Sequence, residues 1–295
     1  MSGYKDFVAG DPLTAAQVDG YLMRQSVMVF ASASARDTAL SGVLAEGMTC
    51  YLTDAPNRIM HYDGAAWGIV SSVDSYRYAL RLDYDASGTF VKATYPLLRA
   101  VRVHVVGAGG GGGSAGTTSA TQCSLTGGGG AGGYAMSFVT DIAGLSASET
   151  ITVGAGGAGG TAAGDGAGGG STSALGFSAG GGSGARGGTA ASSDYASNLG
   201  ANGGTTFTGS PDFSQAGESS SPVVGQLQRS AGGLGATSVF GKGGSNGQAV
   251  TASGQDGSAG TRGSGGGGSA NRPSQATNRA GGAGGDGYVV LELFY

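Results

Sequence analysis

The stretch Val101-Arg102-Val103-His104-Val105-Val106-Gly107-Ala108-Gly109-Gly110-Gly111-Gly112-Gly113 decides how this chain can fold. Its first five residues alternate valine with polar side chains, which predicts a β-strand that presents Val101, Val103 and Val105 on one face. Its last seven residues carry no side chain larger than a methyl group. Ordering glycine costs more conformational entropy than ordering any other residue. Apolar burial by the flanking strands must therefore help to offset that cost.

Glycine clusters of this kind fill most of the chain after residue 107. The chain has 295 residues, of which 65 are glycine, far above the average usage of about 7%. Clusters occur at 107–113, 127–133, 154–160, 164–170, 180–188, 241–247, 263–268 and 281–287. Their spacing along the chain is irregular, so the sequence does not predict a counted solenoid repeat.

Backbone contact is the remaining way to order such clusters. Left-handed segments with three residues per turn leave every N–H and C=O pointing outward. Packed side by side, these segments satisfy each other's backbone groups without side chains. Collagen is excluded, because it needs glycine at every third position and abundant proline, whereas this chain has runs of glycine and only six prolines. We therefore predict packed polyglycine II-type loops.

Two glycine motifs resemble nucleotide-binding loops but lack the required context. Gly107–Gly112 matches G-x-G-x-x-G after a strand, and that mechanism needs a helix to begin there and hold a pyrophosphate. Gly113–Thr118 has no helix-forming tendency. Gly241-Lys242 is followed by Gly243 rather than by Ser or Thr, so it is not a phosphate-binding P-loop. No cofactor is predicted.

Other short runs predict the strands of a β-sandwich. Tyr76–Tyr84 alternates cleanly, with tyrosine and leucine on one face and Arg77, Arg81 and Asp83 on the other. Further strands are predicted at Thr89–Tyr95, Tyr134–Val139, Thr150–Val153 and Tyr288–Tyr295. Together they favour a β-sandwich core from which the glycine-rich loops emerge.

The first part of the chain has ordinary composition. Leu13–Gln25 predicts a short helix. Its narrow, mainly apolar stripe consists of Val18, Tyr21, Leu22 and Gln25, and this stripe is our candidate anchor to a larger particle. A second short helix is predicted after Ser34 and through Leu40. An antiparallel meander is predicted from Met48–Leu52, Arg58–Tyr62 and Ala66–Val70, with Trp67 as its core anchor.

The predicted fold is therefore mainly β. Short N-terminal helices come first, then a small antiparallel meander, then a β-sandwich-like glycine-rich domain with packed polyglycine II-type loops. The predicted boundaries are a helical attachment segment at 1–42, the meander at 43–73 and the glycine-rich domain at 74–295, with its tip beginning near residue 107.

Composition also limits the function. The net charge is −4, so no broad basic field is available to gather nucleic acid or anionic lipid. No apolar run approaches the roughly 20 residues of a membrane span, and Met1–Phe7 lacks a signal-peptide core. We therefore expect synthesis in the cytoplasm, no nucleic-acid partner and no membrane insertion.

Catalytic and metal chemistry is not expected either. The chain has two histidines and two cysteines, and neither cysteine stands in a metal-ligand spacing. Asp165 and Asp286 are isolated, unlike the aspartates of calcium-binding β-helix repeats. The carboxylates of the glycine-rich half are too sparse to predict the paired acids of a glycosidase. We expect a non-enzymatic protein without a metal.

The N-terminal motifs resemble a known family. Leu13–Gln25, Tyr51-Leu52-Thr53-Asp54 and Tyr62–Trp67, followed by Ser87-Gly88-Thr89-Phe90 and a Val-Arg-Val strand, resemble the minor tail proteins of siphophages that infect actinobacteria. The glycine-rich half is similar in style to polyglycine bundles in phage tail-fibre adhesins and to the glycine-rich region of the anaplastic lymphoma kinase receptor. The resemblance implies a virion component at the phage tail, a homotrimer, and partners among other virion proteins.

Two classes of function remain open at this stage. In the first, the glycine-rich tip binds a host cell-surface glycan or protein, because binding residues concentrate on loops held by a rigid scaffold. Candidate contact residues are Tyr195, Phe207, Phe213, Arg229 and Arg272. In the second, the chain is a purely structural head fibre, decoration protein or tail-tip spacer. A third reading, a cell-wall hydrolase, would require turnover of wall fragments.

Deletion of residues 1–40 is expected to leave a folded tip that no longer joins particles.

Overall fold

The computed structural model describes residues 27–54, 58–70, 78–192, 196–227, 229–249 and 253–295, together with Pro12, Thr14 and Ala15. The chain forms two compact units, Met1–Tyr76 and Arg77–Tyr295. Most of the helix predicted at Leu13–Gln25, including the four residues of its stripe, lies outside the described residues.

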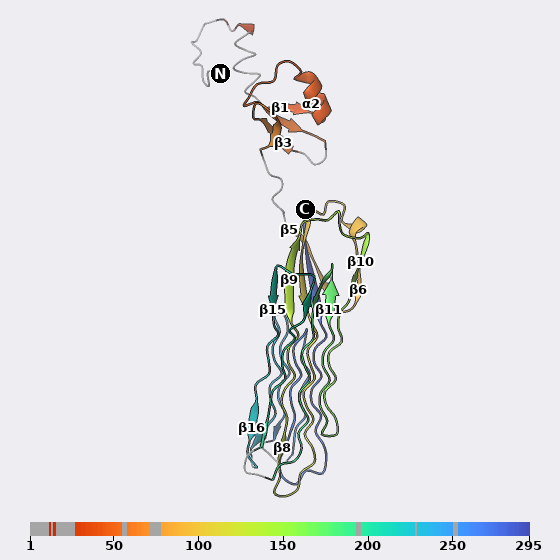
Figure 1. The fold of residues 1–295 in the computed structure, drawn as a ribbon, viewed down its shortest axis with the longest axis vertical. Coiled ribbons are helices and arrows are strands. Elements are labelled where there is room, and N and C mark those ends of the chain that lie inside the picture. Colours follow the sequence, from red (N-terminus) through yellow and green to blue (C-terminus); the bar gives the residue numbers. More distant parts are fainter. Residues whose placement is uncertain are drawn as a thin grey trace. The chain divides into compact units, whose positions relative to one another are not determined.

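The first unit contains a four-stranded sheet with one helix beside it (Figure 1). Its elements are β1 (Val27–Phe30), α2 (Ala33–Ala39), β2 (Thr49–Leu52), β3 (Arg58–Tyr62) and β4 (Trp67–Ile69). β2, β3 and β4 pair antiparallel, which confirms the predicted meander. β1, which the sequence analysis did not predict, pairs parallel to β2. The Ser32 side chain caps α2 by accepting the Ala35 N–H at 3.2 Å.

A small core holds this sheet together. Cys50, Leu52 and Met60 are buried, and Trp67 packs against them. The Arg36 guanidinium lies 4.5 Å from the centre of the Trp67 ring, a cation–π contact that fixes α2 against the sheet. Trp67 thus contributes to the core of the unit.

The second unit contains many short strands and one large sheet. Its strands are β5 (Tyr78–Tyr84), β6 (Gly88–Val91), β7 (Ala100–Val106), β8 (Ser124–Leu125), β9 (Tyr134–Val139), β10 (Ser148–Ile151), β11 (Thr172–Ala174), β12 (Phe177–Ala179), β13 (Ala196–Asn198), β14 (Phe207–Thr208), β15 (Phe213–Gln215), β16 (Val223–Gly225), β17 (Ser230–Ala231), β18 (Gln248–Ala249), β19 (Ala270–Asn271) and β20 (Tyr288–Phe294). The large sheet is antiparallel in the order β15-β9-β7-β20-β5. The predicted mainly β fold class is confirmed.

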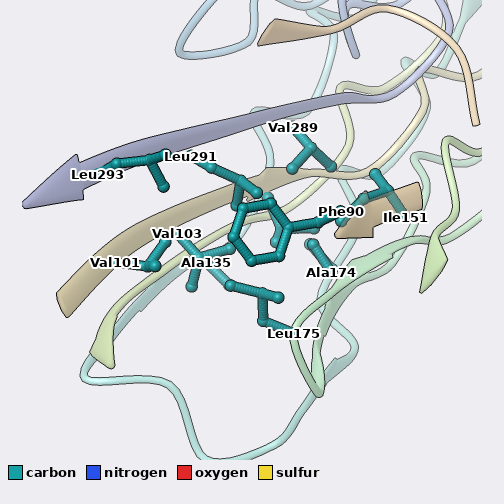
Figure 2. Packing of buried hydrophobic residues seen from close by; sticks show 12 residues of the cluster. Phe90, Val101, Val103, Ala135, Ile151, Ala174, Leu175, Val289, Leu291 and Leu293 are labelled. Carbon is teal, nitrogen blue, oxygen red and sulfur yellow. The ribbon is translucent and has the colours of Figure 1, made fainter. Parts of the chain in front are cut away.

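The alternation that predicted β7 also explains the hydrophobic core. Val101, Val103 and Val105 face inward beside the alternate residues Val289, Leu291 and Leu293 of β20 (Figure 2). β11 and β12 pack against this face, and Phe90 of β6 and Ile151 of β10 join the same cluster. The result is two layers with a shared apolar interior, which is the arrangement of a β-sandwich.

The opposite face of the large sheet carries polar and aromatic side chains. His104 Nδ1 lies 2.7 Å from the Tyr134 hydroxyl, and its Nε2 lies 3.7 Å from Glu292 Oε2. Phe240 packs edge-on against His104 with ring centres 6.0 Å apart. Burial lowers the pKa of His104 below its ordinary value, and the Glu292 carboxylate opposes this only in part.

We expect this histidine to make stability fall in mild acid. The unfolded chain takes up the imidazole proton near pH 6.5, whereas the folded chain takes it up only at lower pH. The contribution is therefore fully present above pH 6.5 and is lost as the pH falls from there to the lowered pKa of the folded state. Urea unfolding midpoints between pH 8 and pH 5 should fall more for the wild type than for His104→Gln. An NMR titration of His104 at or above pH 6.5 would contradict this.

Beyond the sheet, the glycine clusters form a bundle of extended segments that lie side by side (Figure 1). The N–H groups of segment 107–115 donate in three directions that repeat every third residue, over N···O distances of 2.9 to 3.2 Å. The three sets of acceptors lie in 127–133, 164–170 and 279–285. The carbonyls of the same segment accept from three further segments, 157–160, 182–188 and 266–269. A repeat of three residues in bonding is that of a polyglycine II helix.

Two other segments, 126–133 and 263–269, also bond to six others, and these two and 107–115 bond to one another. Around these three lie the peripheral segments 154–160, 164–170, 182–188, 201–205, 217–220, 232–238, 242–248, 255–261 and 279–286. In a hexagonal array of cylinders, three that all touch one another have nine others around them, which is the number of peripheral segments here. Within the described residues the bundle is therefore a complete hexagonal cluster, whose three inner segments are buried along their length.

At many glycines of the inner segments there is no room for a side chain. A Cβ built on Gly110 would lie 2.0 Å from the Ser183 carbonyl oxygen, and one built on Gly129 would lie 2.0 Å from the oxygen of Gly110. In the peripheral segments, exposure has a period of three residues, so that side chains such as Ser183, Arg186 and Thr189 all point to solvent. Glycine is thus needed where two backbones touch.

We expect slow amide exchange in the inner segments. These segments are buried and most of their N–H groups are bonded to neighbouring segments, so exchange requires opening of the bundle rather than local fraying. Hydrogen–deuterium exchange should show residues 107–115, 126–133 and 263–269 among the slowest of the chain, close to the rate for global unfolding. Exchange at the rate of free peptide in these segments would refute the rigid bundle.

Candidate functional site

The bundle brings its chain reversals to one end, far from the large sheet. Successive segments run alternately away from the sheet and back, so the reversals at 116–123, 161–163, 189–199, 221–231, 248–254 and 270–278 meet at the end that carries β8 and β16 (Figure 1). We call the described residues of these reversals the distal loop face. Loops held together on a rigid support are the usual place for binding.

A small core of its own holds this face together. Cys123, Leu125, Ala249 and Ala270 are buried there, with Val223 and Leu227 among the residues packed against them. The short pairs β8–β19, β13–β16 and β17–β18 close the end of the bundle. Both cysteines of the chain are free and buried, so Cys123 acts here as a small apolar side chain.

Hydrogen bonds tie loop 270–278 to loop 116–123. The Asn278 carbonyl Oδ1 accepts the Thr117 N–H at 3.0 Å, and Ser274 donates its N–H to the Ser119 carbonyl at 2.9 Å. Asn271 is fully buried, and its Nδ2 donates to the carbonyls of Gly116 and Thr277. These bonds hold the loop in one conformation.

Among the described residues, Arg229 and Arg272 lie on this face, and Arg186 and Arg279 directly adjoin it. Arg186 and Arg229 are exposed, and Arg272 and Arg279 are half-buried. Two carboxylates of the described residues lie beside the face, and both accept backbone N–H groups of the bundle. Asp165 accepts from Gly187 at 2.7 Å, and Asp256 accepts from Ala280 at 2.9 Å.

Two buried polar atoms in loop 270–280 have no hydrogen-bond partner. They are Asn271 Oδ1 and Arg279 Nε, and among the described residues of the second unit no other buried side-chain nitrogen or oxygen shares this condition. A buried donor or acceptor without a partner is costly in free energy. Such atoms are usually explained by a bound water, an ion or a ligand group.

The predicted contact residues do not form one site. Phe207 lies in β14 and packs against the sandwich core. Phe213 lies in the edge strand β15, where it is 46% exposed and contacts the Tyr134 ring. Arg229 and Arg272 lie on the distal loop face, at the far end of the unit. Tyr195 lies outside the described residues.

The positions of Arg186 and Arg279 in the fold were not predicted from the sequence. The sequence contains a pattern that could have placed Arg186, because in Gly182–Thr189 every third residue points its side chain outward. The same repeat runs through Gly154-Ala155-Gly156-Gly157-Ala158-Gly159-Gly160. Reading each cluster for a period of three would have placed Arg186 outside the bundle near its distal end.

A hollow near the sheet end contains the other notable group of charges. It has a volume of about 340 Å³ and is lined by Asp85, Thr261, Arg262 and Asp286 together with backbone glycine. Arg262 Nε bonds to Asp85 Oδ1 at 3.0 Å, and the guanidinium stacks 4.3 Å from the Tyr288 ring centre. Because these groups satisfy one another, they act as a clamp that joins the turn after β5 to the bundle.

No three acidic, histidine or cysteine side chains of the described chain gather as they would around a metal ion. Across the same residues, no helix is long and apolar enough to span a bilayer.

Fold and site together define a class of protein: a β-sandwich extended by a hexagonal glycine-rich bundle that ends in bonded loops. A family model for a glycine-rich domain matches residues 85–294. The chain belongs to this glycine-rich domain family. No curated protein matches the chain.

Proposed function

We propose that this protein is a non-enzymatic structural component of a bacteriophage virion, a minor tail or tail-fibre protein whose distal loop face binds the host cell surface. The observation that carries the proposal is the bundle itself, which delivers six chain reversals to one end on a support made of backbone hydrogen bonds. A rigid support limits the entropy lost on binding. The proposal also draws on the N-terminal resemblance to siphophage minor tail proteins.

The bundle offers little to catalysis. Its inner segments contain glycine, alanine, serine and threonine only, and the carboxylates Asp165, Asp256 and Asp286 each accept a backbone N–H from a neighbouring segment. These carboxylates act in holding segments together. The arrangement favours display of a surface over turnover of a substrate.

Cell binding tests the proposal. The fluorescently labelled full chain should bind saturably to actinobacterial host cells, and an excess of unlabelled chain should compete. The double variant Arg229→Gln/Asn278→Ala, placed on the distal loop face, should lose affinity. Lys242→Gln, at an outward position near the sheet end, should not. Unsaturable binding that neither variant changes would favour the spacer function.

Particle assembly tests the virion part of the proposal. β1 and α2 belong to the same unit as the meander, so a clean deletion removes residues 1–76 rather than 1–40. Particles made with this deletion should lack the chain in immunoblots, while the second unit accumulates free in the lysate. Incorporation of the truncated chain would place the anchor in the second unit. Analytical ultracentrifugation tests the proposed homotrimer.

A further inference from the structure

We propose that the distal loop face recognises a polyanionic surface glycopolymer, whose repeating units carry phosphate or carboxylate groups, through its arginines. This inference rests on the proposed function and names the class of its ligand. Two kinds of observation carry it: the side-chain chemistry of the face and the unpartnered guanidinium nitrogen of Arg279.

The face differs in charge from the chain as a whole. The chain carries a net charge of −4, yet the described residues of the distal end contain Arg186, Arg229, Arg272 and Arg279. The carboxylates beside them, Asp165 and Asp256, each accept a backbone N–H at 2.7 and 2.9 Å. Each carboxylate keeps its negative charge, so among these described residues four arginines stand against two carboxylates and leave an excess of cations.

The described residues of these loops carry polar rather than aromatic side chains. Ligand sites are lined mainly by apolar and aromatic side chains, with a few polar groups. Within the described residues of the six reversals there is no aromatic side chain. Their exposed polar groups include the guanidinium of Arg229 and the side-chain amide of Asn278. Planar guanidinium forks suit bidentate recognition of phosphate and carboxylate.

Arg279 provides the second observation. It follows directly on loop 270–278. Two hydrogen bonds with Ala115 fix its backbone: the Arg279 N–H donates to the Ala115 carbonyl at 2.9 Å, and the Arg279 carbonyl accepts the Ala115 N–H at 3.0 Å. Its Nε is buried and has no acceptor, whereas its side chain as a whole is only half-buried. The Nε of this side chain is thus a donor that an anionic oxygen of a bound ligand could satisfy.

The test measures binding of the full chain to three immobilised probes: poly(glycerol phosphate), polygalacturonate and neutral dextran. We expect binding to one or both polyanions, none to dextran, and a weakening of about tenfold or more between 50 and 300 mM NaCl, because salt screens exposed charge. Phosphate and carboxylate as the preferred anion are distinguished by the first two probes. Equal binding to dextran, or no dependence on salt, would overturn the inference.

Matched variants locate the site. Arg186→Gln and Lys242→Gln each remove one cation from an outward position of a peripheral segment, the first near the distal end and the second near the sheet end. Arg186→Gln, and more strongly Arg186→Gln/Arg229→Gln, should weaken polyanion binding, while Lys242→Gln should not. Both arginines are exposed, so melting temperatures should stay unchanged. Equal losses for Arg186→Gln and Lys242→Gln would show a diffuse charge effect and overturn the assignment.

The same variants separate this inference from the proposed function. If the wild type binds host cells and the arginine variants bind them equally well, host binding stands and recognition of polyanions falls. If the wild type binds polyanions but no cells, the proposed host contact fails, and the polyanion site remains as a property of the distal loop face.

Discussion

Replacing Gly110 with alanine should strongly destabilise the second unit. The new Cβ would lie 2.0 Å from the carbonyl oxygen of Ser183 and 2.4 Å from its carbon. Both are backbone atoms of a neighbouring segment, so no side-chain rotation relieves the contact. Overpacking a well-filled core usually costs about 1–3 kcal/mol. A clash between bonded backbones should exceed this, and we expect a loss of roughly 4 kcal/mol or more, in the range of the most damaging single substitutions.

Gly168→Ala is the control. A Cβ on Gly168 would meet only the Gly182 carbonyl oxygen at 3.7 Å, which is ordinary contact, and the residue is exposed. Alanine restricts the unfolded chain more than glycine does, so we expect a neutral effect or a gain of up to about 1 kcal/mol. Calorimetric melting of the purified variants checks both. Similar melting temperatures for the two would show that the inner segments are loosely packed.

Inserting one glycine between Gly129 and Gly130 should be as damaging. The donors at 130–133 reach carbonyls of Ser183, Glu218, Gly263 and Gly180 in turn. One extra residue rotates all later groups by a third of a turn, so each faces the wrong neighbour. Burying an unsatisfied backbone group costs about 1–3 kcal/mol. Four such groups match much of the roughly 5–15 kcal/mol that stabilises a typical domain.

Two controls make the insertion informative. One glycine inserted after Ala162, in an exposed reversal, only lengthens a loop and should cost less than about 1 kcal/mol. Three glycines inserted between Gly129 and Gly130 restore the direction of every later donor and displace the segment by one turn. The three-residue insertion should therefore yield more folded protein than the single one, as judged by soluble yield and chemical denaturation. The reverse order would contradict the period of three.

Sequence patterns predicted the β-sandwich better than the bundle. The valine alternation at Val101–Val105 identified β7 and its inward face, because period-two patterns report burial directly. β1 at Val27–Phe30 was missed, since four apolar residues without alternation fit a strand or a helix equally. β14 and β15 are only two and three residues long, too short for any periodicity.

The bundle shows why its neighbours could not be predicted. Hydrogen bonds between polyglycine segments involve identical backbone groups at every residue. Nothing in the sequence around Gly110 therefore indicates that its neighbours are Gly130, Ser183 and Gly266. The sequence indicates that segments of this type pack together, but their order depends on the lengths of the connections. The candidate site was harder still, because Arg229 and Arg272 meet Arg186 at one end only through that order.

The transverse direction of the hydrogen bonds has a mechanical consequence. They run across the bundle, from segment to segment, while the segments themselves run lengthwise from the sheet to the distal loops. Tension between the sheet end and a partner held by the loops would load these bonds in shear and spread the force over many of them at once. Such a rod should resist pulling far better than a hairpin unzipped one bond at a time.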